Sequence, residues 1–379
     1  MQPALDVPFT DLSAMAREVW PAIETDFTQA VLQARYIGGG PVDAFEQQWA
    51  EYCGTTYGIG VANGTDALQL TLQALGVGAG DEVVVPANTF IATAAAVVRA
   101  GATPVFTDVD PDTLLITPEL LEAAITGRTR AVMVVHLYGN MPDMDGLCAV
   151  ADRAGIHLVE DAAQAHGAEW RGKRAGSFGV AGCFSFYPGK NLGGFGDAGA
   201  VVTSDPALAD RIRSLANHGR SNGAAHYEHL FVGTNSRLDT LQAIALSGKL
   251  ARTEDWTEAR IALAARYREK LAGTAARLTT VADQARHVYH LMVVRVPDRD
   301  RVQKLLKGQG VQTGVHYPVP CHHQPPLARY ASGPLPVCEE AATGQLSLPM
   351  FPHMTTEQVD HVCAALIDAL DEVVGDDRA

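Results

Sequence analysis

The chain has 379 residues, of which 47% are hydrophobic and 19% charged, and its formal net charge is −14. This length exceeds that of most single domains, so we expect one large domain and one smaller one. Because general nucleic-acid binders normally carry a basic face, the acidic balance argues against such a partner. It does not exclude a phosphate-bearing ligand, since a pocket can present backbone N–H groups locally.

Nothing in the sequence indicates secretion or membrane insertion. The 6 cysteines include no C-x-x-C pair and are typical of reduced thiols in a cytosolic protein. The N-terminus has no basic segment followed by an apolar stretch, and the longest apolar run, near residues 91–98, is too short to span a bilayer. We therefore expect a cytoplasmic protein without a membrane partner.

The first half of the chain alternates short apolar runs with helical patterns. Helices are predicted over residues 66–75, 90–99, 118–125 and 144–154, and strands over 82–86, 103–109, 131–136, 156–160, 182–186 and 200–203. Uninterrupted apolar strands separated by helices are typical of a mostly parallel sheet covered on both faces. The sequence therefore predicts an α/β fold.

The pattern changes after Asp205. Helical patterns cover residues 207–216, 238–267, 299–309 and 356–374, a strand rich in β-branched residues covers 288–296, and a loop rich in proline and histidine covers 316–326. We place the domain boundary near residue 250. The division gives a large domain over residues 1–250 and a small C-terminal α/β domain over residues 251–379.

Lys190 stands in a glycine-rich loop between two apolar strands, in the segment CFSFYPGKNLGGFGDAGAVVT. Burial lowers the pKa of an ammonium group and frees the amine as a nucleophile, which can form a Schiff base with an aldehyde. This segment alone is equally compatible with a surface lysine. The same loop matches G-x-G-x-x-G, but it runs into a strand rather than a helix, so we do not assign it as a dinucleotide-binding motif.

Asp161 follows the strand predicted over 156–160, at the edge of the sheet where ligands bind in open α/β folds. A carboxylate there can hold a ring nitrogen protonated, because a nearby negative charge raises the pKa of the base. A helix N-cap is the alternative, and the adjacent Glu160 leaves room for one residue in each role. We favour Asp161 as the functional acid because Gln164 and His166 follow in the same loop.

Two further features follow strands on the same side. Gly64 and Thr65 open a predicted helix, where backbone N–H groups can bind a phosphate, although a plain N-cap is the alternative. Phe90 follows the strand at 82–86 and can either stack on a planar ring or belong to the core. Together with the lysine and the acid, they supply the Schiff-base amine, ring-nitrogen partner, phosphate cup and stacking aromatic that pyridoxal 5′-phosphate (PLP) requires.

Seven motifs run along the chain: NGTDAL, PANTF, VHLYG, EDAAQAHGA, FSFYPGKNLGGFGDAGA, NSRLDTLQA and HYPVP. In these motifs, and over essentially its whole length, the sequence resembles the DegT/DnrJ/EryC1/StrS sugar aminotransferases, a family of fold type I PLP enzymes. The resemblance implies a large domain with a mostly parallel seven-stranded sheet. FYPGKNLG followed by GDAG is most similar to 3-aminotransferases that act on dTDP-linked 3-keto-6-deoxyhexoses.

The resemblance implies a role for each residue around the cofactor ring. Lys190 is expected to carry PLP as a Schiff base and, once released, to move a proton between substrate and cofactor. Asp161 is expected to pair with the pyridine nitrogen, Gln164 to bind the ring hydroxyl and Phe90 to stack on the ring. Relatives in which histidine replaces this lysine act as dehydratases, and Lys190 argues against that activity.

The remaining implied contacts concern the phosphate and a second subunit. Gly64, Thr65 and Ser185 are expected to hold the cofactor phosphate, and Asn235, in NSRLD, to reach the phosphate of the neighbouring subunit's cofactor. The resemblance therefore implies a homodimer with shared active sites. In the expected cycle an amino acid, taken to be L-glutamate, converts PLP to pyridoxamine phosphate, and a nucleotide-linked keto sugar then takes the nitrogen.

Contacts to the sugar are expected from HYPVP and the histidines after it. His316, Tyr317 and His322 could face the sugar or its diphosphate; a rigid structural loop ranks second and a metal site last, because no tetrahedral ligand set is visible. We therefore predict no metal. Further candidates for substrate contacts are Tyr187, Tyr227, Arg220 and Arg237.

Three alternatives stay open on the sequence alone. A 4-keto nucleotide sugar could replace the 3-keto one, since only the similarity at residues 187–191 points to C3. A non-catalytic PLP-fold sensor or regulatory protein is the second, and the presence of Lys190 and Asp161 argues against it. A nicotinamide-dependent sugar enzyme would use residues 58–64 as its dinucleotide loop, but the third glycine is missing at the required place.

Overall fold

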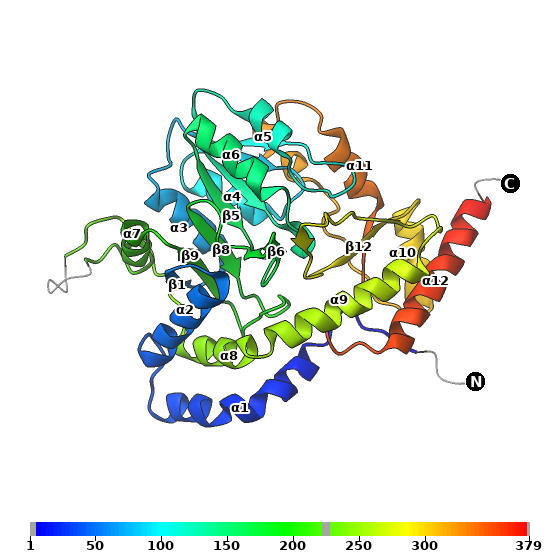
Figure 1. Cartoon of the computed structure of the whole chain (residues 1–379), viewed down its shortest axis with the longest axis horizontal. Coiled ribbons are helices and arrows are strands. Elements are labelled where there is room, and N and C mark those ends of the chain that lie inside the picture. The colour runs from blue at the N-terminus through cyan, green and yellow to red at the C-terminus, as the bar shows by residue number, and fades with distance from the viewer. Residues whose placement is uncertain (1–4, 222–227, 377–379) are drawn as a thin grey trace.

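The computed structural model describes residues 5–221 and 228–376, and its largest element is a seven-stranded sheet (Figure 1). The strand order is β1-β9-β8-β5-β4-β2-β3. The strands are β1 Tyr57–Val61, β2 Glu82–Pro86, β3 Thr103–Thr107, β4 Thr129–Val135, β5 His157–Asp161, β8 Ala181–Ser185 and β9 Gly199–Thr203. β9 runs antiparallel to β1 and β8, and the other neighbouring pairs are parallel. The expected mostly parallel α/β sheet is confirmed.

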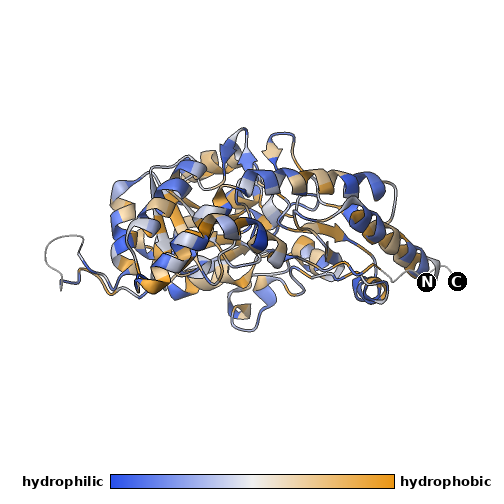
Figure 2. Ribbon diagram, turned by 90° about the horizontal axis from the view of Figure 1, so that it is seen from below, coloured by the Kyte–Doolittle hydropathy of each residue, from blue (hydrophilic) through white to orange (hydrophobic). Residues whose placement is uncertain are grey.

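Helices cover both faces of this sheet. One face packs against α3 (Gly64–Ala74), α4 (Ile91–Arg99) and α7 (Pro206–Ala216), and the other against α2 (Gly40–Cys53), α5 (Pro118–Ala124), α6 (Met144–Ala154) and α8 (Thr240–Leu250). Figure 2 shows hydrophobic residues concentrated between the helices and hydrophilic residues on their outer surfaces. The N-terminal helix α1 (Leu12–Leu32) packs along α8.

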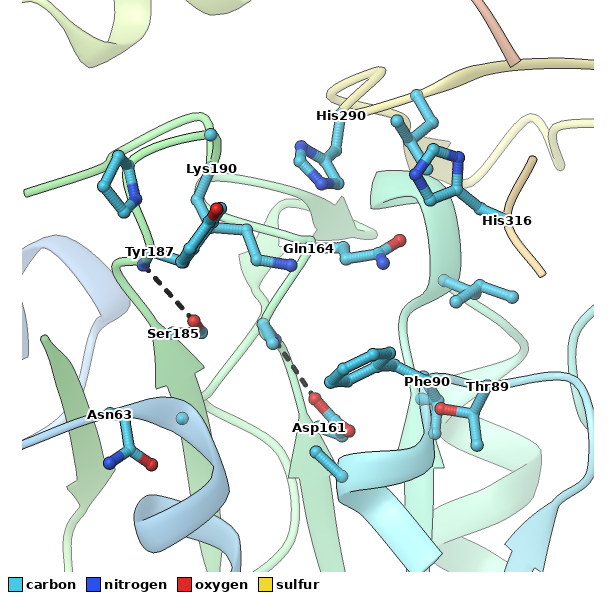
Figure 3. A pocket seen from close by; sticks show the side chains of 18 of the residues that line it. Asn63, Thr89, Phe90, Asp161, Gln164, Ser185, Tyr187, Lys190, His290 and His316 are labelled. Atoms are coloured by element: carbon cyan, nitrogen blue, oxygen red, sulfur yellow. Dashed lines mark hydrogen bonds between the residues drawn. The ribbon is translucent and has the colours of Figure 1, made fainter. Parts of the chain in front are cut away.

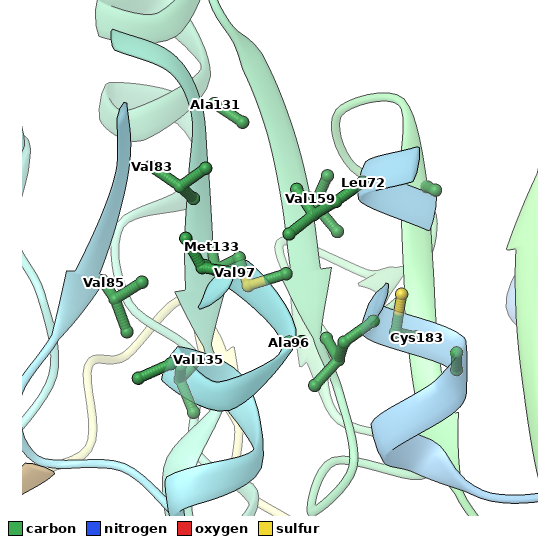
Figure 4. Packing of buried hydrophobic residues seen from close by; sticks show 14 of the residues in the cluster. Leu72, Val83, Val85, Ala96, Val97, Ala131, Met133, Val135, Val159 and Cys183 are labelled. Atoms are coloured by element: carbon green, nitrogen blue, oxygen red, sulfur yellow. The ribbon is translucent and has the colours of Figure 1, made fainter. Parts of the chain in front are cut away.

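The strands are apolar on both faces because both faces are covered. On β2, Val83 and Val85 belong to one core and Val84 belongs to the other. Figure 4 shows Val83 and Val85 on the same side as Met133 and Val135 of β4, packed against the helices of that face. Since successive side chains of a strand point to opposite faces, a continuous run of valines buries apolar surface on both sides.

The C-terminal part of the chain builds a smaller sheet, in the order β10-β12-β13. Its strands are β10 Arg277–Leu278, β12 Met292–Arg295 and β13 Gln345–Leu348, and the helices around it are α9 Thr253–Lys270, α10 Arg299–Gly308, α11 Pro336–Gly344 and α12 Thr356–Asp376. The third sheet consists of β11 Ala285–Arg286, β6 Glu169–Trp170 and β7 Lys173–Arg174. The domain boundary near residue 250, where α8 ends, stays a prediction. Across the described parts of the chain, no helix is long and apolar enough to cross a membrane.

Two expectations from the sequence are wrong. The helix expected over residues 238–267 is divided into α8 and α9, because the Arg252 N–H donates to the Lys249 carbonyl oxygen (2.9 Å) and closes a tight turn between them. The strand expected over residues 288–296 is shortened to β12, because Tyr289 adopts a positive φ of 45°, which a strand does not allow.

Met133→Ala should lower the free energy of unfolding by about 2–5 kcal/mol, because Met133 is fully buried in the central strand β4 and truncation leaves a cavity. Guanidinium unfolding followed by circular dichroism measures the change. Arg130→Ala on the same strand is the control, since Arg130 is exposed and its ion pair with Asp81 should contribute less than about 1 kcal/mol. Equal losses in the two variants would contradict this placement of the core.

Candidate active site

A cavity of about 600 Å³ lies at one edge of the large sheet. Val135, Asp161 and Ser185, the last residues of β4, β5 and β8, line one side of it. The carboxyl ends of these parallel strands meet at this edge, where ligands bind in open α/β folds. Other lining residues come from loops and from the C-terminal half, and Figure 3 labels Phe90, Gln164, Lys190, His290 and His316 among them. Arg260, Tyr317 and Met350 also line the cavity.

Lys190 reaches this cavity from the loop between β8 and β9. Figure 3 shows its side chain extending toward the space between Gln164 and Asp161. Within the described residues, its Nζ makes no hydrogen bond or ion pair, and the charge of Asp161 is the one neighbouring charge that acts on it. Burial lowers the pKa of Lys190 to about 8, and the charge of Asp161 limits the fall. The site therefore offers an amine that is neutral in part near physiological pH.

The two neighbouring acids at the end of β5 have different environments. Glu160 points away from the cavity and is fully buried, where its carboxylate accepts two backbone N–H groups and lies 2.7 Å from His136 Nε2. Asp161 lines the cavity. Since side chains alternate across a strand, only one of two adjacent residues can reach a ligand there. Neither acid caps a helix, because none begins between β5 and β6 (Glu169–Trp170) in the described residues. The N-cap alternative is therefore wrong, and the role of Asp161 as the functional acid stays a prediction.

The carboxylate of Asp161 is held in a fixed position. The Thr93 hydroxyl donates to its Oδ2 (2.7 Å), and the Ala163 N–H donates to its Oδ1 (3.3 Å). Burial raises the pKa of Asp161, while the hydrogen bonds from Thr93 and Ala163 and the charge of Lys190 act in the opposite direction. A cation in the cavity would therefore stabilise the ionised carboxylate.

The start of α3 lies beside the end of β8. Asn63 caps the helix, since its side-chain oxygen accepts the Asp66 N–H (2.8 Å). Gly64 packs against Ser185, and a Cβ at Gly64 would come within 2.6 Å of the Ser185 Cβ. Gly64, Thr65 and Ser185 all line the cavity. A helix start without bulky side chains, next to a hydroxyl, is a suitable place for a phosphate.

Gln164 and two aromatic rings border another part of the cavity. The Tyr138 N–H donates to Gln164 Oε1 (2.7 Å), and Gln164 Nε2 donates to the Tyr317 hydroxyl (3.1 Å). The rings of Tyr317 and Phe90 lie 5.5 Å apart between centroids. Phe90 is 51% exposed, which excludes the alternative that it is a core residue.

Several residues predicted to contact the substrate or the neighbouring subunit's cofactor do not line the cavity. Asn235 and Arg220 are exposed, and Arg237 Nε donates to Asn235 Oδ1 (3.1 Å). Tyr227 lies outside the described residues. The structure does bring Tyr187, His316 and Tyr317 to the cavity. The roles assigned to all of these residues stay predictions.

His322 is buried away from the cavity lining and contacts Glu339. The Nε2 atoms of His322 and His323 lie 3.1 and 3.5 Å from Glu339 Oε1, which is close enough for a metal site among the described residues. Glu339 Oε1 also accepts the Leu335 N–H (3.0 Å), so hydrogen bonds to its neighbours account for its position. The expectation of no metal stays a prediction.

The sequence does not single out Arg260 and His290, which both line the cavity. Asn191 Oδ1 can only accept, so His290 Nδ1 donates to it (3.2 Å) and Nε2 keeps its lone pair. The one signal for Arg260 is its spacing from Trp256 and Tyr267, which puts it on the buried face of α9. A charged residue in a helical pattern normally indicates the solvated face of the helix. For this reason, the sequence does not identify Arg260 as a buried residue.

A model of the DegT/DnrJ/EryC1/StrS aminotransferase family matches residues 21–367. The chain belongs to this family. A dTDP-3-amino-3,4,6-trideoxy-alpha-D-glucose transaminase from Streptomyces venezuelae is 47% identical over 363 residues, covering 95% of each chain. The erythromycin biosynthesis sensory transduction protein EryC1 of Saccharopolyspora erythraea is also 47% identical, over 96% of this chain and 99% of EryC1. The crystal structure of S. venezuelae DesV with a ketimine intermediate has a TM-score of 0.93 at 46% identity, over 96% of this chain and 98% of that chain.

The cavity has the chemical features that PLP requires. The unpartnered amine of Lys190 suits an aldehyde, and the buried carboxylate of Asp161 suits a cationic ring nitrogen. Gly64 packs so closely on Ser185 that a larger residue at position 64 would clash with it, which keeps the backbone of the helix start next to the Ser185 hydroxyl. These residues therefore fit the cofactor that the motifs imply.

The amine of Lys190 should titrate near pH 8 in the cofactor-free chain, because burial lowers its pKa to about that value. Asp161→Asn should move the midpoint to lower pH, since the charge of Asp161 favours the protonated amine. Pulse acetylation across a pH series, read by mass spectrometry of the Lys190 peptide, measures both midpoints. A midpoint near the ordinary lysine value of 10.5 would contradict the buried position of the amine.

Proposed function

We propose that this chain is a PLP-dependent aminotransferase that moves an amino group from L-glutamate to the C3 keto group of a dTDP-linked deoxysugar. The observation that carries the proposal is one cavity that joins Lys190, Asp161 and the start of α3. The S. venezuelae relative, 47% identical over 95% of this chain, is named for a 3-amino dTDP-sugar, which supports C3 rather than C4. The cytoplasmic location inferred from the sequence stays a prediction.

Each residue of the cavity has a proposed part in holding the cofactor. Gly64, Thr65 and Ser185 would bind its phosphate, Asp161 its ring nitrogen, and Phe90 the face of its ring. PLP, when bound, supplies an electron sink for the carbon that loses a proton. Keeping the Asp161 carboxylate ionised next to the ring nitrogen maintains that sink, and the Thr93 and Ala163 donors fix the carboxylate in place.

Lys190 would move the proton in both half-reactions. A group with a pKa of about 8 exchanges protons readily near neutral pH, which suits a general base that later acts as a general acid. His290 and His316, the histidines of the cavity wall, have pKa values lowered by burial, and they stay neutral. They can accept hydrogen bonds from an amine or hydroxyl without competing for the proton.

A homodimer is part of the proposal. Leu230, Phe231 and Val232, close in sequence to Asn235, are exposed apolar side chains, and Val232 is 100% exposed. A second copy would remove this apolar surface from water. It would also bring its own Asn235 toward the cofactor phosphate, as the family resemblance implies.

A sensor or regulatory protein is the second candidate. The name of EryC1, 47% identical to this chain, favours it, because that relative is called a sensory transduction protein. A sensor would bind PLP without turnover. A sensor would use the same cavity, and the presence of Lys190 and Asp161 in it argues against a non-catalytic protein. Turnover by the purified protein separates the two candidates.

The purified chain with L-glutamate should aminate a dTDP-3-keto-6-deoxyhexose roughly 100-fold faster than the 4-keto isomer, because moving the carbonyl by one carbon misplaces the reacting atom by more than about 1 Å. Mass spectrometry detects the product, and NMR locates the new amine. Turnover of the 4-keto sugar alone would overturn the regiochemistry. Turnover of neither sugar would favour the sensor.

A further inference from the structure

A buried cation in the cavity wall has no acidic partner. Arg260, on α9, is 3% exposed and lines the cavity. Its Nη1 donates to the carbonyl oxygens of Met350 (2.9 Å) and Tyr289 (3.2 Å), and no carboxylate pairs with it in the described parts of the chain. Burial lowers the pKa of Arg260 to about 10, which still leaves it charged at neutral pH. Holding an unpaired charge there costs stability, so a function for it is expected.

Other arginines of α9 are satisfied in ordinary ways. Arg266 pairs with Asp360, and Arg268 donates to the Thr279 carbonyl oxygen (2.7 Å) and to the Tyr289 hydroxyl (3.3 Å). Neither lines the cavity. Arg260 is therefore distinguished from both arginines by its position at the cavity, and from Arg266 also by the lack of an anionic partner.

The cavity contains few other positive charges. Lys190 and Arg260 are the lysine and arginine residues among its described lining, and the proposed function uses Lys190 for the chemistry. Burial lowers the pKa of His290, and the charges of Lys190 and Arg260 lower it further, so that ring is neutral. Within this chain's described share of the cavity, Arg260 is thus the cation that remains for an anionic substrate group.

We propose that Arg260 binds the carboxylate of the amino-acid donor, an inference that rests on the aminotransferase function proposed above. The donor's carboxylate is attached to the carbon that loses its proton, so it must enter the cavity together with the reacting atoms. A guanidinium can bind a carboxylate through two parallel N–H donors. The two carbonyl oxygens that bind Nη1 hold the guanidinium in a fixed position for this contact.

The diphosphate of a nucleotide sugar fits this position less well. It is bulky and several bonds from the keto carbon, so it needs the open part of the cavity. Tyr187, 60% exposed, marks the open part, whereas Arg260 is almost completely enclosed. A small carboxylate can reach an enclosed cation that a nucleoside diphosphate cannot.

The test compares Arg260→Met and Arg260→Lys with the wild-type chain loaded with PLP. Single-turnover experiments give the L-glutamate concentration that half-saturates the first half-reaction and the dTDP-3-keto-6-deoxyhexose concentration that half-saturates the second. Arg268→Met is the matched control, because Arg268 lies on the same helix and binds a carbonyl oxygen but does not line the cavity.

We expect the half-saturating L-glutamate concentration to rise roughly 100-fold in Arg260→Met and roughly 10-fold in Arg260→Lys, which keeps the charge but loses the fork. The value for the sugar should stay within about twofold in both variants, and Arg268→Met should change neither value. An unchanged L-glutamate value in Arg260→Met would overturn the proposal. So would a change confined to the sugar, which would assign Arg260 to the diphosphate.

A crystal structure of the wild-type chain with PLP and 2-oxoglutarate decides the question if the variants do not fold. A carboxylate of 2-oxoglutarate in contact with the Arg260 guanidinium supports the proposal, and a carboxylate bound elsewhere overturns it. Failure of the proposed function has a different result: the wild-type chain itself forms no 2-oxoglutarate from L-glutamate.

Discussion

The removal of two opposite charges from water into one cavity is the constraint on which this site depends. Lys190 and Asp161 are close enough for each charge to stabilise the other, yet burial dominates both pKa values, lowering that of the lysine and raising that of the aspartate. Neither group has a full counter-ion within the described residues, so each gains from a ligand. A cofactor with an aldehyde at one end of a basic ring satisfies both groups at once.

The fold keeps these groups in place by satisfying their neighbours. Glu160, next to Asp161, has its carboxylate fully hydrogen-bonded on the opposite face of the sheet. Lys249 lies buried on α8, and its Nζ donates to the carbonyl oxygen of Gly193 (2.6 Å). Gly193 follows Lys190 by three residues in the same loop. This contact ties the loop that carries Lys190 to a helix of the core. Rigid secondary structure thus positions the two groups that are left without partners.

Much of the fold and part of the site can be predicted from the sequence, because local patterns determine them. Valine-rich runs indicate strands buried on both faces, and the end of a strand predicts where Asp161 must lie. Asn63 shows the limit of such reasoning at a helix start. The sequence is compatible with either a plain N-cap or a phosphate site at this helix start. In the structure Asn63 caps the helix, and Gly64 and Thr65 face the cavity.

The rest depends on contacts between segments that are distant in the chain. The segment VYHLMVVRV has the composition of a strand, but Asn191 Nδ2 binds the Val288 carbonyl oxygen and Arg260 binds that of Tyr289. These side chains use backbone acceptors that a neighbouring strand would otherwise bind, so the strand begins only at Met292. The same contacts bring His290 to the cavity. No local pattern encodes this pairing, since its partners lie on a loop of the large sheet and on α9.

Borohydride reduction of the PLP-loaded chain, followed by peptide mapping, tests the central claim most directly. Burial lowers the pKa of both Lys190 and Lys249 to about 8, so the basicity of the amine does not distinguish them. Only Lys190 faces the cavity; Lys249 donates to Gly193 instead. We expect the reduced cofactor on the Lys190 peptide alone. Cofactor on Lys249, or none on Lys190, would contradict the placement of an unpartnered amine at this site.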